Sequence, residues 1–199
     1  WTAGGDPPYQ IWMTHTPNGE HVENARGSSP TREHQSYSGD AFSMYTHCGT
    51  HIDTLNHYGY DGQIWNCYEV AKDLGNRTWH VCGAEKHPPI IARGVMIDVA
   101  AALGVELLPD SYGVGADDLR KARDRQGTKL LPGDVVIVRT GRMTVWPEFD
   151  AYLVNEPGLN LEGAKRLAEA GAIVVGGDNV GVEQLPSVVP DDWIPVPRY

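Results

Sequence analysis

The clearest fold signal in this 199-residue chain is Leu-Pro-Gly-Asp-Val-Val-Ile-Val, residues 131–138. Pro132 and Gly133 favour a turn, and four consecutive β-branched residues follow Asp134. A short apolar run without polar alternation is typical of a strand that is covered on both faces. We therefore predict a buried strand over residues 135–138.

Segments that are typical of helices and of further strands lie before and after this strand in the sequence. Residues 116–126 have helical composition, with acidic residues early and basic residues late, as the helix dipole favours. Residues 161–170 predict a second helix, which Asn160 caps and Gly171 ends. Further strands are predicted over residues 9–14, 78–82, 95–99 and 172–175. Helices that alternate with apolar strands indicate an α/β domain with a largely buried sheet.

The composition limits the classes of partner. With 16 basic and 26 acidic residues the net charge is −10, which disfavours nucleic acid and anionic membranes as partners. No apolar run approaches the ~20 residues that cross a bilayer. Three cysteines without a Cys-x-x-Cys pair favour a reducing, cytoplasmic location. We expect a single domain over residues 1–199 that is incomplete at both ends, because the chain starts without methionine and no helix or strand closes its end.

The functional signal is concentrated in His-Cys-Gly-Thr-His-Ile-Asp-Thr-Leu-Asn-His, residues 47–57. Four of its groups bind metals or move protons, namely His47, His51, Asp53 and His57. Two imidazoles and a carboxylate suit Zn²⁺, Mn²⁺ or Fe²⁺. In an extended strand His47 and Asp53 would lie about 20 Å apart, too far for one ion. The segment must therefore bend, and Gly49 is the natural pivot because glycine tolerates positive φ.

The pattern His-x-Gly-Thr-His-x-Asp-x-x-x-His resembles the signature of the putative cyclase family of metal-dependent hydrolases, which includes bacterial kynurenine formamidase and isatin hydrolase. Every defining position matches, although Leu55 stands where many members have proline. Residues 133–141 and the run from Gly177 to Glu183 also look like family features, with Gly181 at a frequent serine position. The resemblance implies a swivelling β/β/α fold, a mixed buried sheet with flanking helices, and a homodimer or homotetramer.

We predict that His47, His51 and Asp53 hold one Zn²⁺ or Mn²⁺ and leave a position open for a water that attacks a carbonyl. His57 is predicted to move protons between this water and the leaving group, since an imidazole pKa of about 6.5 suits that exchange. The alternative for His57 is direct ligation of this ion or of a second one.

Supporting residues are predicted around this cluster. Four aromatic residues flank the metal segment or the strand before it and can wall a pocket for a flat ring: Trp12, Tyr45, Tyr60 and Trp65. Aromatic side chains are more often core, which is the competing interpretation. Three polar residues are expected to brace the loop or to orient the ligand histidines from behind: Thr50, Asp178 and Glu183. Turn or cap duty is the equal alternative for the last two.

The leading hypothesis is a metal-dependent hydrolase that opens an amide, imide or lactone carbonyl of a small, ring-containing substrate. A trans-dienelactone-type lactone hydrolase is a close variant. A non-haem Fe²⁺ oxygenase also uses two histidines and one carboxylate, but its second histidine usually comes from far downstream. A metal-binding relative that has lost turnover is the remaining alternative.

Overall fold

The computed structural model describes residues 8–15, 38–76, 78–146 and 148–198. The chain divides into two compact units, residues 1–57 and residues 58–199. None of the helices in the described part has both the length and the apolar character that a bilayer crossing requires. Residues 17–40, whose many asparagine, glycine, serine and charged residues predict a long surface loop, lie outside the described residues except for residues 38–40.

In the described part of the first unit, β1 (Gln10–His15) and β2 (Gly39–Ser43) pair as an antiparallel hairpin. Ile11 lies opposite Phe42, and the Tyr9 ring stacks on Phe42 with centroids 6.5 Å apart. Cross-strand pairs of this type stabilise a two-stranded sheet. The strand predicted over residues 9–14 is thus confirmed, with its bounds moved by one residue, and β2 leads directly into the metal segment.

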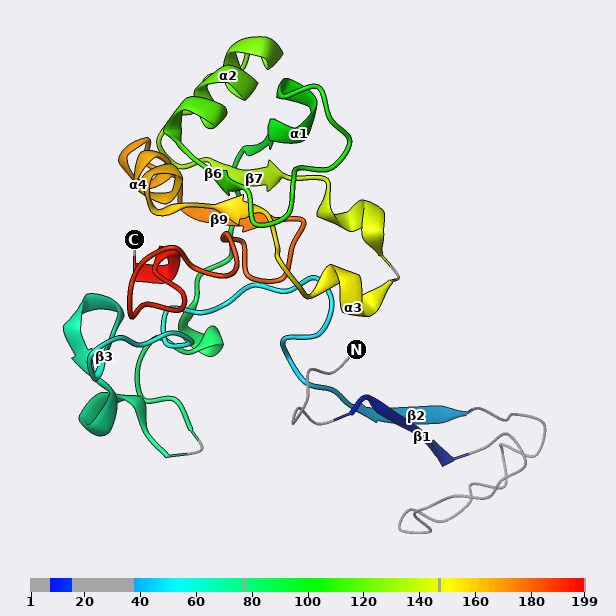
Figure 1. Cartoon of the computed structure of the whole chain (residues 1–199). Coiled ribbons are helices and arrows are strands. Elements are labelled where there is room, and N and C mark those ends of the chain that lie inside the picture. Colours follow the sequence, from blue (N-terminus) through cyan, green and yellow to red (C-terminus); the bar gives the residue numbers. More distant parts are fainter. Residues whose placement is uncertain (1–7, 16–37, 77, 147, 199) are drawn as a thin grey trace. The chain divides into compact units, whose positions relative to one another are not determined.

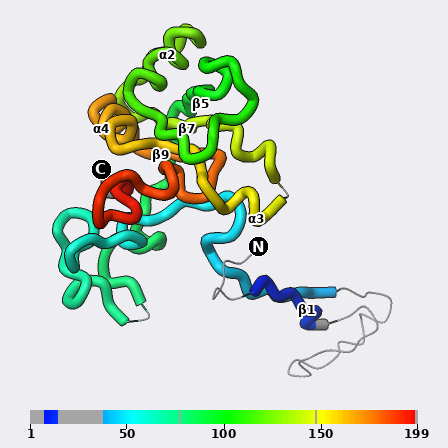
Figure 2. Tube along the Cα trace, in the orientation of Figure 1, coloured from blue at the N-terminus to red at the C-terminus, as the bar shows by residue number. Residues whose placement is uncertain are grey.

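The second unit is organised around a parallel sheet in the order β5-β7-β9 (Gly94–Asp98, Val135–Arg139 and Val174–Gly177), whose strands lie one below the other in Figure 2. Val95 pairs with Val136, and Val136 pairs with Val175. The central strand is the one predicted from residues 135–138, and Val136 and Val138 are at most 1% exposed. The last strand starts two residues later than predicted.

Helices α2 (Ala116–Gln126) and α4 (Leu161–Glu169) lie beside this sheet (Figure 1). Leu119 of α2 and Leu167 of α4 belong to the same buried cluster as Ile97 of β5. The Asn160 side chain accepts a hydrogen bond of 2.9 Å from the backbone N–H of Gly163, as the capping prediction required. The two predicted helices are therefore confirmed.

Shorter elements complete the second unit. These are α1 (Val99–Ala102), α3 (Phe149–Tyr152), the antiparallel pair β3 (Gln63–Ile64) and β4 (Tyr68–Glu69), the parallel pair β6 (Gly113–Val114) and β8 (Gly158–Leu159), a π turn (Val70–Leu74), and 3-10 turns at Trp65–Cys67, Ala84–Lys86, Arg142–Val145 and Val196–Arg198. Parallel and antiparallel pairs with flanking helices make the fold mixed α/β, as predicted.

The strand predicted over residues 78–82 is wrong. These residues form bends, because the His80 N–H turns back to the carbonyl of Leu74 (3.1 Å) and Cys82 adopts a φ of +59°. A left-handed residue interrupts an extended run, and alternating side chains alone do not supply a partner strand.

Candidate metal centre

The metal segment follows β2 as an irregular loop rather than a helix or strand. Gly49 has a φ of +68°, which confirms that it is the pivot of the bend. The carbonyl of Gly49 lies 2.8 Å from Nδ1 of His51, so this ring is held by its own loop. An Nδ1–H donor to that carbonyl leaves Nε2 of His51 as the nitrogen with a free lone pair.

The bend brings three potential ligand atoms together. His47 Nδ1 lies 3.2 Å from His51 Nε2 and 3.0 Å from Asp53 Oδ1, and the last two atoms are 3.4 Å apart. Ligand atoms about 2.1 Å from one ion, at angles between 90° and 110°, are separated by about 3.0–3.4 Å. The three side chains are 25%, 28% and 49% exposed, so small molecules reach them from solvent. The donor set therefore fits a divalent ion with three protein ligands and an open side.

His57 lies beside this set. Its Nε2 is 3.8 Å from Asp53 Oδ2, and its ring centroid is 4.1 Å from that of His47 at an interplanar angle of 33°. Burial lowers the pKa of His57; Asp53 opposes this shift, and the nearby His47 and His51 add to it. A neutral imidazole is a proton acceptor, so the geometry agrees with a base beside the three ligand atoms. The assignments of all four residues stay predictions.

A turn that sequence reasoning missed joins Asp53 to His57. The Thr54 hydroxyl donates a 2.6 Å hydrogen bond to Oδ1 of Asn56, and the His57 N–H donates to the Thr54 carbonyl at 2.9 Å. Asn56 is 6% exposed. It is the only buried residue in the described part of the first unit. Asparagine and threonine are common in turns, and that was the available signal.

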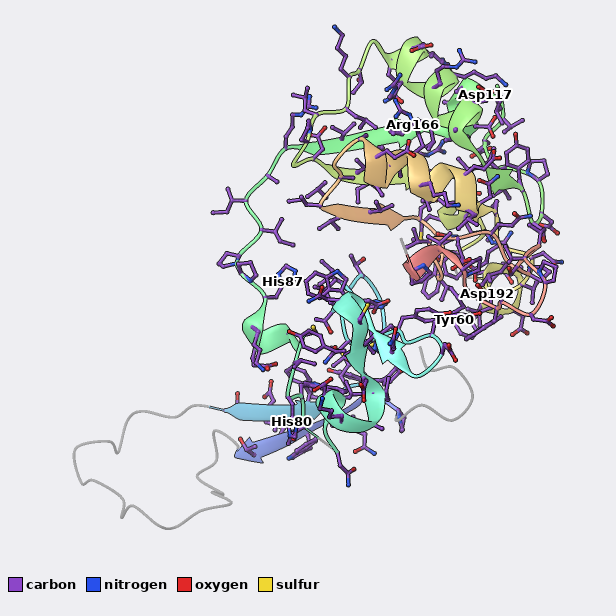
Figure 3. The ribbon with its side chains drawn as sticks, turned by 90° about the vertical axis from the view of Figure 1, so that its left-hand side faces the viewer. Tyr60, His80, His87, Asp117, Arg166 and Asp192 are labelled. Carbon is purple, nitrogen blue, oxygen red and sulfur yellow. The ribbon has the colours of Figure 1, made fainter. Side chains whose placement is uncertain are left out.

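The predicted aromatic residues are all partly open to solvent. Trp12 lies on β1 opposite Ala41 and is 49% exposed. Tyr60 and Trp65 belong to the second unit and are 48% and 54% exposed; Figure 3 labels Tyr60, whose backbone exchanges hydrogen bonds with Gln63. The Tyr45 ring lies 5.2 Å from His47. A substrate-binding role for these residues stays a prediction.

Asp178 makes the contacts of a cap. Its Oδ1 accepts from the Thr140 N–H at 2.8 Å and from the Thr140 hydroxyl at 2.7 Å, and its Oδ2 accepts from the Gly141 N–H at 2.8 Å. These bonds tie the end of β7 to the residue after β9. The expected role of Asp178 behind the ligand histidines stays a prediction, and so does that of the exposed Thr50.

Glu183 is 1% exposed, and its Oε1 has no hydrogen-bond partner in the part of the chain that the structure describes. Burial raises the pKa of Glu183 to about 7, while a hydrogen bond from the Val196 N–H opposes the shift. A carboxyl group in this setting binds its proton near neutral pH. A glutamate in the sequence gave no indication of this burial. The expected role of Glu183 behind the ligand histidines also stays a prediction.

Two more buried charged groups escaped the sequence analysis. Arg142 is 3% exposed and donates through Nε to the Tyr152 carbonyl at 3.2 Å. Glu156 is 1% exposed and accepts from the Val180 N–H at 2.8 Å, while burial raises its pKa. Both satisfy backbone groups of neighbouring loops, which is how buried charges are usually tolerated.

A family model described as putative cyclase matches residues 6–184 of the chain. No curated protein matches it. Among solved structures, that of a novel cyclase is 24% identical with a TM-score of 0.77, and the match covers 92% of this chain and 61% of that one.

Two isatin hydrolases are also similar in structure. Isatin hydrolase A from Ralstonia solanacearum is 18% identical with a TM-score of 0.66, over 96% of this chain and 64% of that chain. Isatin hydrolase A from Labrenzia aggregata, bound to benzyl benzoate, is 19% identical with a TM-score of 0.55, over 88% and 70%. The chain spans less than two thirds of the novel cyclase and of the Ralstonia enzyme. At these identities the likeness concerns the fold.

Proposed function

The chain belongs to the putative cyclase family, and on that premise we propose that it is a metal-dependent hydrolase that opens an amide, imide or lactone carbonyl of a small, ring-containing substrate. The observation that carries the proposal is the meeting of His47 Nδ1, His51 Nε2 and Asp53 Oδ1 at separations of 3.0–3.4 Å. Structural zinc sites usually have four protein ligands, whereas three ligands with an open side are typical of catalytic sites.

A bound divalent ion, Zn²⁺ or Mn²⁺, would supply Lewis-acid polarisation of the carbonyl and a lower pKa for water. The chain provides the directed donors for it. The Gly49 carbonyl orients His51, and the carboxylate of Asp53 adds the negative charge that favours a cation. Because all three ligands come from seven consecutive residues, a single loop presents the complete set.

His57 is the proposed proton carrier. A neutral His57 accepts a proton at Nε2 from the attacking water, and Asp53 Oδ2, 3.8 Å away, stabilises the imidazolium that forms. The hydroxyl joins the carbonyl carbon, the C–N or C–O bond breaks, and the proton passes from His57 to the leaving nitrogen or oxygen. One histidine thus serves both halves of the hydrolysis, and no other reactant is required.

Isatin is the first substrate to test, because three of the similar structures are isatin hydrolases. A panel should add an N-formyl arylamine and an aromatic lactone, so that amide and ester cleavage are compared. Protein stripped with EDTA is expected to lose turnover, and Mn²⁺ or Zn²⁺ is expected to restore it. Full turnover by the metal-free protein would refute the proposal.

Two other outcomes of the same assay separate the alternatives. Oxygen uptake with 2-oxoglutarate and Fe²⁺ would indicate an oxygenase, although a three-stranded parallel sheet with helices differs from the β-barrels typical of that class. Tight metal binding without turnover on any substrate would indicate a binding relative that has lost catalysis.

A homodimer or homotetramer is part of the proposal. Support comes from the hairpin of the first unit, where Ile11 and Phe42 are 59% and 64% exposed, since large apolar side chains favour an interface. Light scattering at two protein concentrations tests it, and a monomer at both would contradict it. A cytoplasmic location stays a prediction.

A further inference from the structure

We propose that Thr54 and Asn56 form a positioning clamp that sets the distance between Asp53 and His57, so that turnover depends on it while metal affinity does not. Neither residue has a role in the donor set or in the proton transfer described above. The inference rests on the proposed function, because it assigns part of the machinery of the same reaction.

The clamp consists of two hydrogen bonds across one turn. The His57 N–H donates to the Thr54 carbonyl at 2.9 Å, which closes a four-residue β-turn between Asp53 and the His57 ring. Inside the turn, the Thr54 hydroxyl donates to Asn56 Oδ1 at 2.6 Å. The backbone bond alone defines a turn, whereas the side-chain bond restricts which turn geometry is populated.

The burial of Asn56 increases the free-energy cost of losing this hydrogen bond. Asn56 is 6% exposed, and the loss of a hydrogen bond to a buried amide oxygen costs more than the loss of one to an exposed oxygen. Leu55, between the two partners, is 45% exposed, so the turn is not held by an apolar side chain at that position. The polar pair therefore restrains this short connection together with the backbone hydrogen bond.

The two oxygens of the Asp53 carboxylate face different partners. For this reason metal binding and turnover should respond differently when the turn is loosened. Oδ1 lies with the nitrogens of His47 and His51, whereas Oδ2 faces His57 at 3.8 Å. Residues before the turn thus supply all three ligand atoms, and only His57 lies after it. Loosening the turn displaces His57 relative to Oδ2 and leaves the ligand atoms in place.

Thr54→Val tests the clamp, because valine keeps the shape of threonine and removes the hydroxyl donor. Its matched control is Thr54→Ser, which keeps the donor. We expect Thr54→Val to lower kcat about tenfold, with KM and the Kd for Mn²⁺ within about twofold of wild type, because misplacement rather than lost binding is the defect. Thr54→Ser should retain kcat within about threefold.

A double-variant cycle adds a second criterion. Once Asn56→Ala has removed the acceptor, adding Thr54→Val should lower kcat no further, because both changes break one bond. Additive losses, equal kcat values for the valine and serine variants, or a parallel loss of kcat and Mn²⁺ affinity would each overturn the clamp.

Amide hydrogen exchange at His57 keeps the test independent of the substrate. The His57 N–H donates to Thr54, and we expect its exchange to be about tenfold faster in Thr54→Val than in Thr54→Ser. If wild-type protein binds Mn²⁺ but hydrolyses nothing, the proposed function fails while this measurement still decides the clamp. Unchanged exchange in Thr54→Val would overturn it whatever the activity.

Discussion

Asp53 places its two carboxylate oxygens on two different partners: Oδ1 lies 3.0 Å from Nδ1 of His47, and Oδ2 lies 3.8 Å from Nε2 of His57. One side chain thus joins the proposed ligand set to the proposed proton carrier. The arrangement allows metal binding and proton transfer to be separated by substitution, since the two functions meet at this carboxylate and at the contact between the His47 and His57 rings.

Replacement of His57 should affect turnover and spare the metal. In His57→Gln we expect kcat to fall by about 10²–10⁴-fold, the usual contribution of a general acid–base group, with the Kd for Mn²⁺ within about threefold of wild type. Steady-state kinetics and calorimetric titration with Mn²⁺ measure the two quantities. The matched control is His87→Gln, an exposed histidine of the second unit, which should change neither. A large loss of Mn²⁺ affinity in His57→Gln would instead assign this residue to the ligand set.

Replacement of Asp53 should affect both functions. Asp53→Asn removes the negative charge from Oδ1 and from the oxygen that faces His57, so we expect affinity for Mn²⁺ to fall by more than about 100-fold and turnover to disappear. Asp61→Asn, at an exposed aspartate of the second unit, is the control. Calorimetry and the isatin assay provide the measurements, and retained Mn²⁺ affinity in Asp53→Asn would contradict the ligand assignment.

Replacement of Gly49 at the bend should weaken the affinity for Mn²⁺. At a φ of +68° an L side chain is strained by about 1 kcal/mol, which corresponds to a roughly fivefold weaker Kd for Mn²⁺ in Gly49→Ala. Apart from Gly49 and its two chain neighbours, no described residue has an atom within 4 Å of the position that a Cβ would take, so strain rather than collision is the expected cause. Gly49→Asn should recover part of the loss, because asparagine tolerates the left-handed region. Equal affinity in wild type and Gly49→Ala would show that the bend is not needed for binding.

Glu183 should make the free energy of unfolding depend on pH. Its pKa is raised from 4.5 to about 7 in the folded protein, so the folded state binds the proton more tightly than the unfolded state. The stability gained from this proton is complete below pH 4.5 and is lost as pH rises to about 7, by roughly 3 kcal/mol in total.

Glu183→Gln removes this titration. The difference in unfolding free energy between wild type and Glu183→Gln, measured by urea denaturation from pH 4.5 to 8, should therefore change in favour of the variant as pH rises. Glu169→Gln is the control, because that side chain is 70% exposed. A difference that stays constant across the range would contradict the raised pKa.

Local sequence signals predicted the regular elements well where side chains within one segment suffice. Asn160 and Gly171 bound α4 because capping and left-handed termination depend on neighbouring residues only. The prediction for residues 78–82 is wrong because a strand also needs a partner, and the His80 N–H bonds to Leu74 instead. The two-residue pairs β6 and β8 had no local signal, since they form only when segments 45 residues apart in the sequence meet, as Gly113 and Gly158 do.

The same division applies to the site. The spacing of His47, His51 and Asp53 required a bend, and Gly49 marked its place, because the reach of one metal ion is a local geometric constraint. Sequence alone thus determined the ligand types and the loop that presents them. The burial of polar groups such as Asn56 and Glu183 could be read only from the folded chain, because burial depends on packing that no local pattern encodes.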